Sequence, residues 1–110
     1  MSYEIHFISP FNPSECPDEH YLPDAAAAVL NYALAGVKQP PLSEWNPKIQ
    51  GHHAEGGIAK AIAYMLTEPT ACLWAMKETT HEDYEDAIWC AMQLWKACRS
   101  WPDHNLRISF

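Results

Sequence analysis

The chain has 110 residues, of which 48% are hydrophobic and 19% are charged, and its formal net charge is −7. This length fits one domain, and the balance of apolar and charged residues excludes a wholly disordered chain. The seven Lys and Arg residues are scattered, whereas direct nucleic-acid binding needs basic patches. We therefore expect a single domain over residues 1–110 that does not bind nucleic acid and prefers a protein partner with a basic surface.

The sequence also predicts a cytoplasmic protein without membrane association. Residues 1–4 lack the basic and apolar regions that open a signal peptide, and no apolar run approaches the roughly 20 residues needed to cross a bilayer. Of the four cysteines, Cys72, Cys90 and Cys98 lie among apolar residues in helical patterns. Together with Cys16, they are expected to be reduced, unbridged thiols.

Residues 2–8 are predicted to form a strand. Apolar Tyr3, Ile5 and Phe7 alternate there with polar side chains, which is the period of a half-buried strand. The following residues, 9–23, contain four of the nine prolines. We expect this proline-rich segment to be an irregular connection with no element of its own.

A helix of strong helix formers is predicted over Ala25–Ala35. Asp24 is expected to cap its N-terminus, and Gly36 is expected to follow its C-terminus. Residues 37–57 are then predicted to be an irregular loop, because Pro and Gly interrupt any periodicity. Connections of this length are usually functional or mobile, so Trp45 within the loop is a candidate binding residue.

Three further helices are expected in the second half of the chain. Ile58–Thr67 has apolar residues at helical spacing, and a short helix is predicted over Ala71–Lys77. The best-defined helix covers about His81–Ser100, and Thr79 and Glu82 at its start are spaced as a capping box. Its apolar stripe contains Tyr84, Ala87, Ile88, Ala91, Trp95 and Cys98.

Residues 106–110 alternate in polarity and are predicted to form a second strand. Two isolated strands most simply pair with each other. The sequence therefore predicts an α+β, helix-rich fold of about four helices with a small two-stranded sheet that pairs the N- and C-terminal strands.

The long helix carries the principal candidate binding site. At about 100° per residue, Trp89 points nearly opposite the apolar stripe, among charged and polar neighbours. A large aromatic side chain inside a charged rim is typical of a protein-binding hot spot. The alternative is that Trp89 packs beneath the proline-rich segment or the N-terminal strand. The candidate binding residues are Trp89, Glu82, Glu85, Asp86, Lys96 and Trp45.

Residues 52–55 are the main candidates for a metal site. His52, His53 and Glu55 are ligand types of zinc and other divalent metals, and His52 and Glu55 share a face if a helix begins early. The sequence supplies no third ligand at a diagnostic spacing. Adjacent histidines in a glycine-flanked loop are more often exposed polar residues, so we expect no metal and no cofactor.

No coherent catalytic set emerges from the sequence. Glu82 and Glu85 lie one helical turn apart, but the predicted neighbouring helices offer no second acidic pair, and no serine lies in a Gly-x-Ser-x-Gly motif. We expect a non-catalytic interaction protein that acts as an inhibitor, immunity-type protein or adaptor. Small acidic proteins of this kind are common on phages and other mobile elements, which is an analogy only.

The sequence is also compatible with two alternative functions. The first is a metal-dependent enzyme or metal-binding protein that uses His52, His53 and Glu55. The second is a homo-oligomer, such as a homodimer, in which helix 81–100 packs against its twin.

Overall fold

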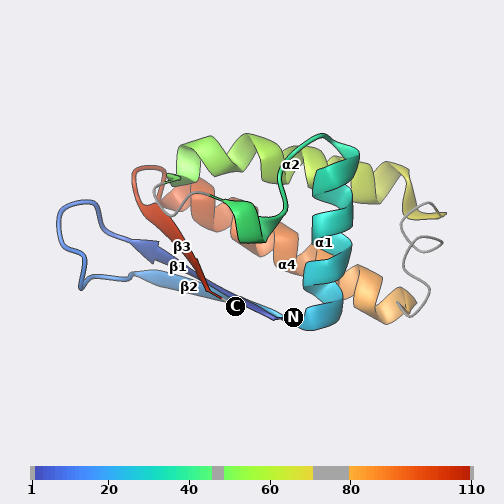
Figure 1. Ribbon diagram of the computed structural model, residues 1–110, viewed down its shortest axis with the longest axis horizontal. Helices are drawn as coiled ribbons and strands as arrows, with labels where there is room; N and C mark the ends of the chain where they lie inside the picture. The colour runs from blue at the N-terminus through green and yellow to red at the C-terminus, as the bar shows by residue number, and fades with distance from the viewer. Residues whose placement is uncertain (1, 46–48, 71–79, 110) are drawn as a thin grey trace.

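The computed structural model describes residues 2–45, 49–70 and 80–109. It is an α+β fold in which helices cover one face of a three-stranded antiparallel sheet (Figure 1). Helix α4 (His81–Ser100) is central, because it packs against α1 (Asp24–Gly36), α2 (Gly51–Thr67) and strand β2 (Asp18–Leu22). Within these three stretches of chain, no helix is long and apolar enough to cross a membrane.

Strand β1 (Tyr3–Ile8) lies at the centre of the sheet, between β2 and β3 (Asn105–Ser109). The antiparallel pairing of β1 with β3 confirms that the strands near the two chain ends are neighbours. Phe7 and Leu106 are partners across these strands, and both are fully buried against the helices. Glu4 and His6 alternate with the buried positions and therefore lie on the outer face of the sheet.

Strand β2 shows that the expectation of no element within residues 9–23 was wrong, and the sheet has three strands instead of two. Prolines 17 and 23 lie just outside the strand, so each of its five residues keeps a backbone N–H group for pairing. The pairs run from Tyr3 and Leu22 to Phe7 and Asp18. Because the segment is rich in proline, the sequence predicted no regular element there, although a short strand lies between Pro17 and Pro23.

The helices of the described residues also differ in detail from those expected. The described residues contain three α-helices and a short 3₁₀ helix, η1 (Leu42–Glu44), while the helix expected over Ala71–Lys77 lies outside the described residues. Residues 37–57 are not irregular throughout, because α2 begins at Gly51 instead of Ile58. Its first N–H groups bond to carbonyls that follow α4: Gly51 N–H donates to His104 O and His52 N–H to Pro102 O, both at 3.0 Å. The sequence around Gly51 contains no such cap, so the earlier start could not be predicted from it.

The buried side chains form one cluster between the helices and the sheet. On α4, the predicted apolar stripe is confirmed in part. Leu94 was not included in the stripe and is fully buried, whereas Ile88 and Trp95 are only half-buried. The other four predicted members, Tyr84, Ala87, Ala91 and Cys98, are buried.

Two helix ends differ in detail from their predictions. The capping box of α4 uses Thr80 and Asp83, one residue later than expected, with Asp83 N–H donating to Thr80 Oγ1 at 3.1 Å. Helix α1 has Pro23 at its N-cap position with no side-chain cap, and it includes Gly36. The left-handed residue after α1 is Lys38, with φ of 61°. Gly36 instead provides space, because a Cβ atom there would lie 2.7 Å from the ring of Tyr64.

Candidate functional site

Trp89 lies on the outer face of α4, away from the core. Its side chain is 64% exposed, and that of Met92, three residues later, is 40% exposed. The buried face of the same helix packs against α1, α2 and β2. This packing fixes the position of the helix, and Trp89 faces solvent on its opposite side. The alternative of a Trp89 side chain packed beneath the N-terminal segments does not agree with this exposure.

Acidic side chains lie on the N-terminal side of this aromatic residue. Residues three and four apart are neighbours on a helix surface, so Glu85 and Asp86 lie one turn before Trp89, while Glu82 lies two turns before it. All three acids are exposed, as is Lys96 on the other side. We call the exposed set Glu82, Glu85, Asp86, Trp89, Met92 and Lys96 the α4 surface. The structure places the five predicted residues of α4, together with Met92, on one continuous face.

Trp45 does not belong to the α4 surface. It is half-buried beside α2, and its indole Nε1–H donates to Pro40 O at 2.9 Å. It lines a hollow of about 270 Å³ between η1 and the first turns of α2. The described residues that line this hollow are Gln39, Pro40, Glu44, Trp45, Ile49, His53, Ala54 and Gly57.

The predicted metal ligands lie on the first turns of α2, where their side chains have other contacts. His52 Nδ1 lies 2.7 Å from Pro102 O, and the rings of His52 and His53 are 3.9 Å apart between centroids. Glu55 Oε1 lies 3.8 Å from Arg99 Nε on α4. Among the residues that the structure describes, no group of three or more His, Cys, Asp and Glu side chains could hold a metal ion.

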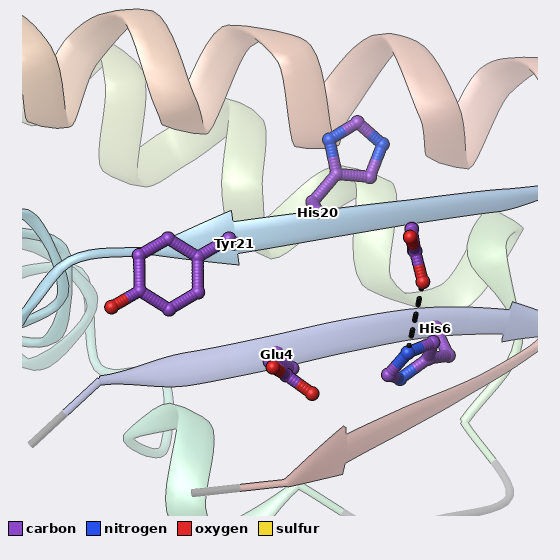
Figure 2. A pocket seen from close by; sticks show the side chains of 5 residues that line it. Glu4, His6, His20 and Tyr21 are labelled. Carbon is purple, nitrogen blue, oxygen red and sulfur yellow. Dashed lines mark ion pairs between the residues drawn. The ribbon is translucent and has the colours of Figure 1, made fainter.

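The sequence did not indicate a polar hollow of about 240 Å³ on the sheet, lined by Glu4, His6, Glu19, His20 and Tyr21. Figure 2 shows Glu4 and His6 on the side of β1 that faces away from α4, whereas His20 points toward α4. His6 Nε2 lies 3.2 Å from Glu19 Oε2. The alternation of β1 was the available signal for His6, but its partner could not be found while β2 was unrecognised.

This hollow is poorly suited to acid–base chemistry. One ring nitrogen of His6 is engaged with Glu19, and the other, Nδ1, is buried without a hydrogen-bond partner. A general base must bring a nitrogen within hydrogen-bonding reach of a substrate proton. The hollow is therefore a polar feature of the sheet, and the α4 surface is the stronger candidate site.

The fold and the α4 surface together define a small acidic α+β protein that presents an aromatic side chain within a charged rim. No protein-family model, curated protein or solved structure matches the chain. Its function must therefore be inferred from the chemistry of its own surface.

Proposed function

We propose that this is a non-catalytic interaction protein that binds a basic protein partner through the α4 surface. The observation that carries the proposal is the 64% exposure of Trp89 within an acidic rim. Tryptophan is among the residues most enriched at binding hot spots, because its large ring buries much apolar area on association. An inhibitor, an immunity-type protein or an adaptor would each use such a surface.

The charges support a basic partner over a neutral or acidic one. The chain carries a net charge of −7, and three of the six residues of the α4 surface are carboxylates. Rim charges chiefly steer the encounter and select the partner, whereas a central aromatic residue supplies affinity. The same charges oppose self-association through this surface, because two copies would bring like charges together.

Affinity capture from the source organism, followed by binding measurements with the purified partner, tests the proposal. Trp89→Ala should weaken binding by about 2 kcal/mol or more. Replacing Glu85 and Asp86 by Gln and Asn should mainly slow association and flatten its dependence on salt. Tyr21→Ala is a matched control, because Tyr21 is a 59% exposed aromatic residue on the sheet and its loss should leave this binding unchanged.

Stability measurements show whether the Trp89 variant is folded. Trp89→Ala should change the free energy of unfolding by no more than about 0.5 kcal/mol, since the side chain is largely exposed. Leu94→Ala, on the buried face of the same helix, should cost about 2–5 kcal/mol. Equal destabilisation by both changes would mean that Trp89 belongs to the core. If folded Trp89→Ala binds the partner as tightly as the unaltered chain, the α4 surface is not the binding site. A dimer detected by light scattering would favour self-association over binding of a different protein.

A further inference from the structure

The loop between β1 and β2, residues 9–17, lies at one end of the long axis of the molecule (Figure 1). It extends beyond the helices and presents Phe11, whose side chain is 94% exposed. Among the exposed large apolar side chains that the structure describes, Phe11 is the most exposed. A single exposed apolar residue is common on protein surfaces. Whether Phe11 is suited to binding therefore depends on how rigidly the loop backbone is ordered around it.

Hydrogen bonds within the loop fix the backbone on both sides of Phe11. Ser9 Oγ accepts from the N–H groups of Phe11 and Asn12, both at 3.3 Å. Ser9 N–H donates to Glu15 O at 3.0 Å, which closes the base of the loop. The side chain of Asn12 accepts from both the N–H and the hydroxyl of Ser14, at 3.2 and 2.7 Å.

Proline restricts the same loop further. Residues 10, 13 and 17 are prolines, whose rings fix the backbone angle φ. A loop that is already ordered loses little conformational entropy on binding. Phe11 is thus presented in a preorganised way by a protruding loop, with its ring free to be buried by another molecule.

Charge indicates which kind of molecule that is. The loop carries Glu15, and the adjoining strand β2 carries Asp18 and Glu19. No Lys or Arg occurs anywhere in residues 1–37. Glu15, Asp18 and Glu19 outnumber Arg107, which lies opposite His6 on β3. A pocket with a basic rim would therefore attract this end of the molecule, whereas an anionic membrane or nucleic acid would not.

We propose that the loop at residues 9–17 inserts Phe11 into an apolar pocket of a partner protein, and that basic residues surround this pocket. A convex loop with a single anchor requires a concave site, such as the substrate cleft of an enzyme that acts on anionic substrates. The inference goes beyond the binding role of the α4 surface and does not depend on it, because it stands on the loop alone.

A photo-cross-linker at position 11 of the full chain tests this insertion. Phe11 is replaced by p-benzoylphenylalanine, and the protein is irradiated in lysate of the source organism. The same replacement at Tyr21, on the outer face of the sheet, is the control. We expect a protein adduct specific to position 11, and mapping of the adduct should place it in an apolar pocket with Lys or Arg at its rim.

Binding of the cross-linked protein to purified variants then measures the contribution of the anchor. Phe11→Ala should weaken binding at least about 30-fold and leave the melting temperature unchanged, since the ring is exposed. Phe11→Leu, which keeps an apolar side chain, should lose less than about tenfold. Binding by the unaltered protein should also weaken as salt is raised.

Several outcomes would overturn the proposal: no protein adduct at position 11, an adduct on a flat surface, or a partner that binds Phe11→Ala as tightly as the unaltered chain. Vesicles of phosphatidylcholine, with and without phosphatidylglycerol, test the membrane alternative. A blue shift in the emission of Phe11→Trp on adding vesicles, beyond that of the unaltered chain, would replace the protein pocket by a lipid surface. Trp89→Ala, measured in the same assays, separates the two proposals: loss with Trp89→Ala alone supports only the α4 surface, and loss with Phe11→Ala alone supports only the loop.

Discussion

Cys98 has a side chain packed entirely within the core, on the buried face of α4. Burial, with a smaller contribution from Glu55, raises the pKa of the Cys98 thiol to about 12. Burial and nearby Asp86 also raise the pKa of Cys90. All three described cysteines, Cys16 among them, are free, as the sequence predicted, and Cys72 lies outside the described residues.

The thiols should therefore differ in reactivity. At pH 8, we expect a thiol reagent to modify exposed Cys16 quickly and Cys98 only when the protein unfolds, because only the thiolate is nucleophilic. Mass spectrometry of peptides after timed labelling measures this order. Labelling of Cys98 at the rate of Cys16 under native conditions would contradict its burial.

The raised pKa of Cys98 also predicts a pH dependence of stability. The unfolded thiol titrates near its ordinary value of 9.0, whereas the folded thiol holds its proton up to about pH 12. Above pH 9, the unfolded state therefore binds fewer protons than the folded state, and stability falls as the pH rises toward 12. Urea unfolding at pH 8 and pH 10 should show this loss, and Cys98→Ala should reduce it.

At the scale of elements, the first turn of α2 depends on a close approach to the end of α4. A Cβ atom on Gly51 would lie 2.4 Å from Trp101 O and 2.8 Å from Cys98 O, both of which are backbone atoms. Glycine is thus required at this position for lack of space. Gly56, five residues later in the same helix, has nothing within 4 Å of an added Cβ.

These two glycines give opposite predictions for the same substitution. Gly51→Ala must push α2 and α4 apart, and we expect it to destabilise the fold by about 1–3 kcal/mol. Gly56→Ala should stabilise it by about 0.5–1 kcal/mol, because alanine loses less backbone entropy in a helix interior. Thermal melts of both variants provide the comparison. A stabilising Gly51→Ala would show that the two helices are further apart at this position.

At the scale of the whole molecule, β3 joins the end of the chain to its beginning. It pairs with β1 along five residues, and Leu106 N–H also donates to Ile49 O at 2.8 Å. One short strand therefore links the centre of the sheet with the segment that leads into α2. Its buried residue Leu106 lies opposite Phe7.

Deletion of residues 106–110 should consequently affect the entire fold. It removes one of the two partners of β1 and exposes Phe7, which is fully buried in the intact chain. We expect the melting temperature to fall by more than about 5 °C, measured by circular dichroism. Arg107→Ala, an exposed change within the same strand, is the control and should have little effect. A deletion variant that melts like the full chain would show that β3 does not stabilise the sheet.

The elements that have strong local patterns could be predicted from the amino-acid sequence. The alternation of residues 2–8, the helical spacing of His81–Ser100 and the pairing of the two terminal strands agree with the structure. The direction of Trp89 was predictable for the same reason, because on a long helix the angle between two side chains follows from their spacing.

The remaining features depend on contacts between residues that lie far apart in the sequence. Strand β2 forms because β1 supplies partners for the short stretch between two prolines. Helix α2 starts seven residues early because the carbonyls of Pro102 and His104 accept its first N–H groups. Trp45 is separated from the α4 surface because it lies at the hollow between η1 and the first turns of α2. Local propensity cannot indicate such long-range hydrogen bonds and packing, and so it could not locate these parts of the molecule.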